Sequence, residues 1–364
     1  MPSPHSAIGT SVFYPERSRG ATGSAIVGFG MYIPNNRITV EEIAKHWGRD
    51  PKEIISGLGV KEKSVAGPDE DSFTLAFEAG RQAIDTAGIR SSEISAIFTG
   101  SESHPYAVKP TSGMLAAALD LHPFSFCADL EFACKAGTAG LQIVDAFVRS
   151  GQITYGMAVG TDKAQAKPGD ALEYTAAAGA AAIVVGSDTS EHAFCRIEHT
   201  ISFTTDTPDF WRTADAPYPA HAGRFTGEPG YFLHVRQALT GILSVTKTKL
   251  SAIDHVVLHM PNAKFPGKIA REFRISKEQM QAGFIVPHIG NTYSACSLLG
   301  LVHVLKEAKK GQKILLVSYG SGAGADAFLL SMLRDAPALP PDTRPLHYLS
   351  YGEYRRNTDK SAVS

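Results

Sequence analysis

Residues 132–144 read FACKAGTAGLQIV, a stretch in which a cysteine stands where a β-rich segment gives way to an amphipathic helical pattern. A thiol at the N-terminus of a helix lies at the positive end of the helix dipole, and Lys135 adds positive potential. We therefore predict that the thiolate of Cys134 is favoured and that this sulfur accepts an acyl group. The alternative is a buried structural cysteine, which is the more frequent fate of a free thiol.

The same order of segments occurs twice along the chain. In the first half AIFTGSES precedes residues 132–144, and YGMAVGTD and AAAIVVG follow; in the second half HVVLHMPN precedes GNTYSACSLLGLVHVL, and KILLVSYGSG and ADAFLLSML follow. Glu102 and Cys134 are 32 positions apart, and so are His259 and Asn291. Two copies of one βαβ unit would bring these four side chains together at a pseudo-twofold axis, although apolar strands also match by chance.

His259, Asn291 and Glu102 each have a catalytic and a structural interpretation. His259 follows the β-rich run DHVVL, where an imidazole can donate to a carbonyl oxygen or move a proton, but most of the 13 histidines need no such role. Asn291 either binds a ligand carbonyl through its amide or caps a helix. Glu102 is either a base for a carbon-bound proton, its pKa raised by desolvation, or a solvated loop carboxylate.

The string YGSGAGAD at 319–326 lacks the third glycine of a dinucleotide fingerprint and leads into a strand, which disfavours a Rossmann site. We interpret it as a glycine-rich turn that lets backbone approach the nucleophile, with Ser321 near a substrate carbonyl. Lys264, Lys268 and Arg224 are candidates to hold the phosphates of a CoA. Lysines four positions apart are also typical of an ordinary solvated helix face.

Alternating strand and helix patterns from Ala25 onward are typical of an α/β fold. We expect a strand in AIVGFGMYIP, a helix over 36–47 with a cap at Thr39, and a core helix over 72–87 that leads into the strand ISAIFTG. We divide the chain into a flexible extension at 1–24, a half at 25–190 with the cysteine, and a half at 191–364 with the histidine and asparagine. A long insertion at about 203–232 is rich in aromatic residues, which argue against disorder.

Composition excludes several classes of protein. Lys plus Arg total 35 against 36 for Asp plus Glu, so no net charge draws the chain to nucleic acid. No apolar run reaches the roughly 18 residues that span a bilayer, so we expect no membrane association. The 4 cysteines show neither C-x-x-C spacing nor the density of a disulfide scaffold, which favours a reducing cytoplasm. We expect no metal site. Residues 1–24 lack the apolar core of a secretory signal, with a transit peptide as the weaker option.

Long motifs now point to a family. GSESHPYAVKPT, DLEFACKAGTA, PGDALEYTAAAGAA, HxGRFTGEP, PNxKFP and IGNTYS resemble the archaeal-type hydroxymethylglutaryl-CoA synthases, and the resemblance extends from about Ala25 to about Tyr354. It implies a thiolase fold of five layers, αβαβα, with two pseudo-equivalent halves, and a homodimer. It also implies an acyltransferase of class EC 2.3.3.10 in isoprenoid (mevalonate) biosynthesis, with acetyl-CoA and acetoacetyl-CoA as substrates and no permanently bound cofactor.

The resemblance further implies residue roles. Cys134 would be acetylated, Glu102 would remove a methyl proton, and His259 would activate the acetoacetyl-CoA carbonyl as general acid before hydrolysis releases the product. Residues implied to line the acyl group are Thr175, Thr226, Asn291 and Ser321. Residues implied to bind CoA are Asp50, Arg224, Lys264 and Lys268, the last of which stands where we expect arginine and so lacks the guanidinium fork. Expected partners are an acetoacetyl-CoA thiolase and a small OB-fold, zinc-ribbon scaffold protein.

Each rival interpretation of the function can be distinguished from the synthase by one residue. A β-ketoacyl synthase III-like enzyme or a C-acyltransferase would also use a cysteine, a histidine and an asparagine, but it needs no carboxylate base, so Glu102 discriminates. A thiolase would have a second cysteine near the glycine-rich turn, where this chain has Ser321. A silent scaffold subunit would usually have lost Cys134.

Overall fold

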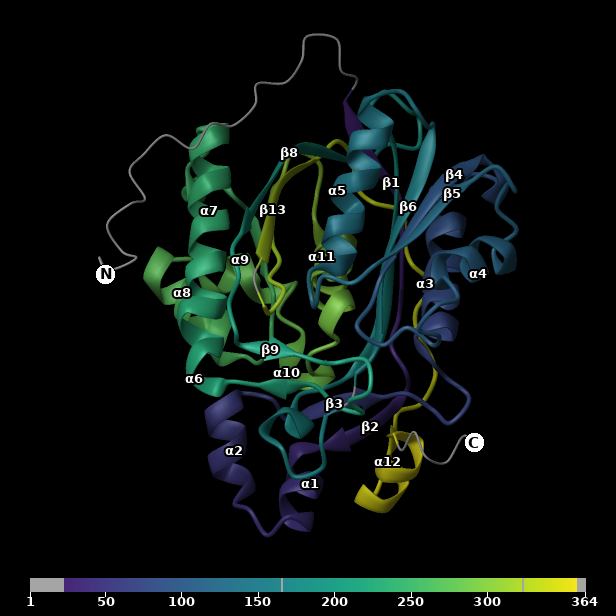
Figure 1. Ribbon diagram of the computed structural model, residues 1–364. Coiled ribbons are helices and arrows are strands. Elements are labelled where there is room, and N and C mark those ends of the chain that lie inside the picture. Colours follow the sequence, from purple (N-terminus) through teal and green to yellow (C-terminus); the bar gives the residue numbers. More distant parts are fainter. Residues whose placement is uncertain (1–22, 165, 323, 359–364) are drawn as a thin grey trace, which may run out of the picture.

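A computed structural model describes residues 23–164, 166–322 and 324–358 (Figure 1). The predicted flexible extension at 1–24 lies outside the described residues except for Gly23 and Ser24, and Ser24 opens the first strand. One nine-stranded mixed sheet has the order β11-β12-β13-β8-β1-β7-β6-β4-β5. Its strands are β1 Ser24–Tyr32, β4 Ile94–Gly100, β5 Phe126–Leu130, β6 Tyr155–Lys163, β7 Ala178–Ser187, β8 Cys195–Thr204, β11 His255–Leu258, β12 Lys313–Val317 and β13 Gly324–Met332.

The sheet consists of two limbs with matching topology. In the first limb β4 runs parallel to β6, and β6, β7 and β1 then alternate in direction. In the second limb β11 runs parallel to β12, and β12, β13 and β8 alternate in the same way. Within the described residues, the second limb has no counterpart of the edge strand β5. The limbs join where β1 and β8 pair over three residues, as in the pair Ala25 and Arg196.

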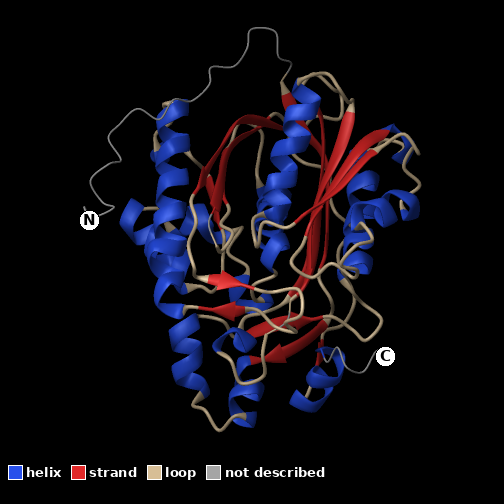
Figure 2. Ribbon diagram, viewed as in Figure 1, coloured by secondary structure: helices blue, strands red, loops and turns tan. Residues whose placement is uncertain are grey.

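Helices fill the space between the limbs and cover both outer faces, as Figures 1 and 2 show. Between the limbs lie α5 Ala136–Arg149 and α11 Cys296–Glu307, whose buried side chains share one core with both limbs. Outside the first limb lie α3 Ser72–Ala87 and α4 Thr111–Ala118, and outside the second lie α7 Phe232–Thr246 and α8 Lys264–Phe273. The predicted five layers, αβαβα, are therefore confirmed.

Local sequence signals explain two helices that pack against the first limb of the sheet, α5 and α3. Leu141, Val144 and Val148 recur at helical spacing on one face of α5, and all three are buried against the sheet. In α3, as predicted over 72–87, Asp71 and Thr74 form a capping box and Gly88 ends the helix in the left-handed conformation.

The predicted helix over 36–47 is wrong in its first turn. Residues Asn36–Thr39 form β2, which pairs with β3 Glu62–Val65 and with β14 His347–Tyr348, and α1 Val40–His46 begins only afterwards. The partners of β2 come from distant parts of the chain, so pairing overrode the local helical pattern. The predicted cap is confirmed, because Thr39 Oγ1 accepts from the Glu42 N–H at 3.1 Å.

Shorter elements complete the described chain. The insertion at 203–232 is ordered: β9 Phe210–Trp211 and β10 Ala220–His221 form a hairpin, followed by α6 Gly223–Phe225 and a π-helical turn, η3 Thr226–Tyr231. No helix in the described ranges is long and apolar enough to cross a membrane. The remaining elements are α2 Pro51–Leu58, η1 Ser91–Glu93, η2 Ala171–Tyr174, η4 Leu250–Ala252, α9 Lys277–Gln281, α10 Val286–Ile289, η5 Tyr293–Ala295 and α12 Tyr351–Thr358.

Candidate active site

Cys134 lies in the tight turn between β5 and α5. The preceding residue, Ala133, has a positive φ of 44°, a conformation that costs energy for a residue with a Cβ and is typical of functional turns. The glycine-rich turn packs directly against this segment, because a Cβ on Gly320 would lie 2.6 Å from the Phe132 carbonyl oxygen. The interpretation of that turn as one that lets backbone approach the nucleophile is confirmed.

The Cys134 thiol faces the Glu102 carboxylate. Cys134 Sγ donates to Glu102 Oε1 at 3.1 Å, which joins the loops that follow the neighbouring strands β5 and β4. Only 4% of Cys134 is exposed. Thiol and carboxylate therefore meet as the repeat alignment predicts. Cys134 lies in a small apolar cluster, as a structural cysteine would, but its sulfur faces a carboxylate, and its role as the nucleophile stays a prediction. Glu102 is not the solvated loop residue of the alternative interpretation, since it lies in a cavity wall against the thiol.

The predicted thiolate is wrong for this state of the protein. Burial and the Glu102 carboxylate raise the pKa of Cys134 well above its usual range. Lys135 does not offset this, because its Nζ donates to Asp326 Oδ1 at 2.9 Å and Oδ2 at 3.1 Å and is neutralised there. The free enzyme holds a neutral thiol that must transfer its proton as it reacts.

Burial raises the pKa of Glu102 to about 8, as the desolvation argument predicts, with the charge of Asp162 as the second cause. Asp162 is a residue of this cavity that the sequence did not single out. Its carboxylate accepts from the Ser101 and Ser103 hydroxyls and from the N–H groups of Glu102 and Ser294, at 2.7 to 2.9 Å. The available signal was an aspartate at the end of the apolar strand YGMAVGTD.

His259 lies directly after β11 and is 1% exposed. Burial lowers its pKa to about 3, so the imidazole is neutral at physiological pH. Its Nδ1 has no hydrogen-bond partner among the described residues. The Tyr231 hydroxyl donates to the His259 carbonyl oxygen at 2.7 Å and fixes the backbone.

Asn291 lies beside Thr175, a residue of the other half that is predicted to line the acyl group. Its Oδ1 accepts from the Tyr293 N–H at 3.0 Å, a cap-like contact, and its own N–H donates to the Thr175 carbonyl oxygen at 2.8 Å. Tyr293 packs with Cys134 in one small apolar cluster. The structural role of Asn291 is thus present, and the ligand-binding role stays a prediction.

Ser294 links the N-termini of the two central helices at the pseudo-twofold axis. Its hydroxyl accepts from the Gly137 N–H at 3.0 Å and donates to the Gly100 carbonyl oxygen at 2.8 Å. The two repeats therefore meet at Ser294, and Glu102 and Cys134 are in direct contact. That the side chains of His259 and Asn291 converge with them stays a prediction. Within the described chain, no hydrogen bond connects His259 to either of them.

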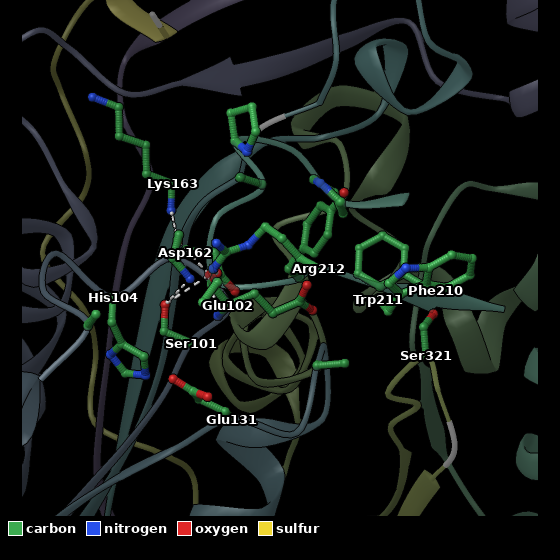
Figure 3. A pocket seen from close by; sticks show the side chains of 18 of the residues that line it. Ser101, Glu102, His104, Glu131, Asp162, Lys163, Phe210, Trp211, Arg212 and Ser321 are labelled. Atoms are coloured by element: carbon green, nitrogen blue, oxygen red, sulfur yellow. Dashed lines mark hydrogen bonds between the residues drawn. The ribbon is translucent and has the colours of Figure 1, made fainter. Parts of the chain in front are cut away.

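A cavity of about 540 Å³ opens onto Glu102 (Figure 3). One wall comes from the ends of β4 and β6, with Ser101, Glu102 and Asp162, and the opposite wall comes from the hairpin of the insertion. Predicted site residue Ser321 lines it together with Phe210, Trp211 and Arg212 from that hairpin, which the sequence analysis did not select. Thr226 Oγ1 is buried elsewhere in the insertion and has no partner in the described ranges.

The predicted CoA-binding residues lie away from this cavity. Arg224 is exposed and stacks on the Phe225 ring at 4.4 Å, and Lys268 is exposed over the Phe232 ring at 4.1 Å. Lys264 is exposed at the first position of α8. Asp50 Oδ1 caps α2 by accepting from the Lys52 N–H at 2.9 Å. The structure thus places Arg224, Lys264 and Lys268 on adjoining elements, and the solvated-face alternative stays open.

Described residues contain no group of three or more His, Cys, Asp or Glu side chains that could hold a metal ion. Residues 243–332 match a sequence profile described as 3-Oxoacyl-[acyl-carrier-protein (ACP)] synthase III C terminal. This match agrees with the fold of the second limb and by itself leaves the reaction open.

Comparisons with whole proteins decide the family. Similar structures include an HMG-CoA synthase complexed with CoA, with a TM-score of 0.83 at 23% identity over 92% of this chain and 90% of that one. A 3-oxoacyl-(acyl carrier protein) synthase III from Pseudomonas aeruginosa PAO1 gives a TM-score of 0.78 at 21% identity over 88% and 100%. These likenesses establish the thiolase-type fold.

Sequence relatives are much closer. The chain is 52% identical to hydroxymethylglutaryl-CoA synthase of Archaeoglobus fulgidus over 90% of its length and 96% of that protein. It is 50% identical to the enzyme of the same name from Methanosphaera stadtmanae over 92% and 97%. Identity at this level over nearly the whole of both proteins confirms the family suggested by the motifs: the chain belongs to the hydroxymethylglutaryl-CoA synthases, acyltransferases of the thiolase superfamily.

Proposed function

We propose that the chain condenses acetyl-CoA with acetoacetyl-CoA through an acetyl group carried on Cys134. The observation that carries the proposal is the 3.1 Å contact between the Cys134 thiol and the Glu102 carboxylate. A nucleophile and a base in contact can perform covalent acyl transfer and proton abstraction at one place.

The first step is acetyl transfer. The Cys134 sulfur attacks the thioester carbonyl of acetyl-CoA, the bond from that carbon to the CoA sulfur breaks, and CoA leaves as the thiol. The proton that CoA acquires comes from Cys134, and Glu102 lies in hydrogen-bond contact to pass it on. A neutral thiol that loses its proton only as it attacks is protected from side reactions in the free enzyme.

The second step forms the carbon–carbon bond. Glu102 removes a proton from the methyl group of acetyl-Cys134, and the resulting carbon nucleophile attacks the ketone of acetoacetyl-CoA. A carboxyl group with a pKa of about 8 is a stronger base than an ordinary glutamate and is matched to neutral pH. His259, being neutral, donates a hydrogen bond to the ketone oxygen, where negative charge develops. The alkoxide that forms then takes up one proton and becomes the hydroxyl of the product, which balances the proton that Glu102 removed from the methyl group.

The third step is hydrolysis. Water attacks the carbonyl carbon of the Cys134 thioester, the C–S bond breaks, the sulfur regains a proton, and hydroxymethylglutaryl-CoA leaves. Thr175, Thr226, Asn291 and Ser321 are proposed to line the acyl group. Arg224, Lys264, Lys268 and Asp50 are proposed to hold CoA, and the reaction needs no permanently bound cofactor.

The proposal extends to assembly. A homodimer through the edge strand β5 is supported by the exposure of Phe124 (90%) and Phe126 (54%). These large apolar side chains lie beside a sheet edge that no further strand of the described residues pairs with. Acetoacetyl-CoA thiolase and an OB-fold, zinc-ribbon scaffold protein are proposed as further partners, in the cytoplasm. We propose no nucleic-acid partner, because the near-neutral net charge of the chain gives no general attraction to a polyanion.

One experiment tests the reaction. The protein is mixed with acetyl-CoA, the Cys134 peptide is examined for an acetyl adduct by mass spectrometry, and acetoacetyl-CoA is then added. We expect the adduct to form and then to be consumed, while Glu102→Ala forms the adduct but fails to condense. Normal condensation by Glu102→Ala would contradict the synthase mechanism and favour the β-ketoacyl synthase III-like alternative, which needs no carboxylate base.

A further inference from the structure

The cavity beside Glu102 contains two cationic side chains, Lys163 and Arg212. The Lys163 ammonium is engaged, because Nζ donates to the carbonyl oxygens of Glu70 at 2.9 Å and of Gly67 at 3.4 Å. Burial lowers the pKa of Lys163, because it destabilises the charged ammonium form. Lys163 therefore has little capacity left for a ligand.

Arg212 is different. Its Nη2 donates to the Glu102 carbonyl oxygen at 3.2 Å, and no carboxylate within the described ranges forms an ion pair with its guanidinium. Most of its N–H donors are left for solvent or a ligand. Figure 3 shows Arg212 beside Glu102, on the wall that the hairpin supplies with Phe210 and Trp211. The contact with the Glu102 backbone places the guanidinium next to the residue whose carboxylate faces the Cys134 thiol.

The proposed reaction creates an anion at this place. Acetyl and acetoacetyl groups are neutral, but hydrolysis of the Cys134 thioester converts the carbonyl bound to sulfur into a carboxylic acid, which ionises. The new carboxylate forms beside the thiol, and the thiol lies 3.1 Å from Glu102 Oε1. A planar guanidinium is the protein group best matched to a carboxylate, since it can bind both oxygens at once.

We propose that Arg212 forms the subsite for the carboxylate of the hydroxymethylglutaryl product, an inference that rests on the proposed function. Its guanidinium binds the carboxylate, a charge that the acyl group of the product carries and the acetyl and acetoacetyl groups lack. Two consequences follow: the cavity on the Glu102 side holds the free acid end of the product, and the predicted CoA residues on α6 and α8 hold its other end.

The test compares two ligands that differ only in this group. Hydroxymethylglutaryl-CoA carries the carboxylate, and 3-hydroxy-3-methylbutyryl-CoA is the same acyl chain without it. Their Kd values are measured by calorimetry for the wild-type protein, for Arg212→Met, for Arg212→Lys and for the control Arg81→Met. Arg81 is an exposed arginine on α3 that pairs with Glu78, remote from the cavity.

We expect the wild type and Arg81→Met to bind the carboxylate ligand about tenfold or more tightly than its neutral analogue. Arg212→Met should abolish this preference while binding the neutral analogue normally, and Arg212→Lys should restore part of it. Equal affinity of the wild type for both ligands overturns the proposal. So does an equal loss of affinity for both ligands in Arg212→Met. Failure of the proposed function would be seen separately, as no acetyl adduct on Cys134 in the wild type.

Discussion

Lys135 and Asp326 form a buried ion pair that ties the nucleophile turn to the second limb of the sheet. The Lys135 ammonium lies 2.9 Å from Asp326 Oδ1, and the two side chains are 5% and 0% exposed. Asp326 also accepts from the Thr138 and Ser202 hydroxyls at 2.8 and 2.7 Å. The residue after Cys134 thus serves to anchor the turn and gives the sulfur no net positive charge.

Removing one partner of this pair should destabilise the protein strongly. Lys135→Met leaves the Asp326 charge buried without its cation, and we expect a loss of about 3 to 5 kcal/mol in the free energy of unfolding. Denaturant titration measures it. The matched control is Lys309→Met, which breaks the exposed pair with Asp335 and should cost less than about 1 kcal/mol. Similar losses in both variants would show that the buried pair is no anchor.

The condensation step should accelerate as pH rises through about 8. Only the carboxylate form of Glu102 can take the methyl proton, and its raised pKa keeps much of the group protonated at neutral pH. Single-turnover condensation on pre-acetylated protein measures the profile. Asp162→Asn removes the negative charge that helps to raise the pKa of Glu102, so its inflection should move to lower pH. A profile that Asp162→Asn leaves in place would contradict this coupling.

Loss of the His259 imidazole should separate the two half-reactions. In His259→Ala, acetylation of Cys134 should persist, while condensation falls by roughly 10² to 10⁴-fold because the ketone oxygen loses its donor. Rapid-quench measurement of each step checks this. Because burial lowers the pKa of His259 to about 3, the wild-type condensation rate should show no histidine inflection between pH 5 and 7. An inflection there that disappears in His259→Ala would mean that the charged imidazole is the active form.

Charge reversal on α8 should weaken CoA binding. Lys268→Glu places a negative charge beside the proposed phosphates, and we expect the KM for acetyl-CoA to rise roughly tenfold, about 1.4 kcal/mol, with kcat changed less. Lys268→Arg should retain or improve affinity, since arginine adds the fork geometry. Steady-state kinetics measure the KM of each variant for acetyl-CoA, with Lys309→Glu as the control for charge reversal elsewhere on the surface. An unchanged KM would leave Lys268 as an ordinary solvated lysine.

Much of the fold was predictable because its signals are local. The helix over 72–87 and the strand ISAIFTG were predicted from apolar spacing, and the cap at Thr39 from its hydroxyl. The helix predicted over 36–47 failed in its first turn because the strands that pair with β2 come from 62–65 and 347–348, which no local window contains. The domain bounds at 25–190 and 191–364 stay predictions.

The order of residues already specifies the reactive groups: one cysteine just before a helix, a carboxylate and an imidazole at strand ends, and a repeat that brings two helices to one axis. The charge states of these groups depend on how the folded chain packs. Packing buried Glu102 beside Asp162, directed Lys135 to Asp326, and placed Arg212 against the Glu102 carbonyl. Proton affinity depends on solvent exclusion and on neighbouring charges in space, and neither is encoded in the order of residues near the cysteine.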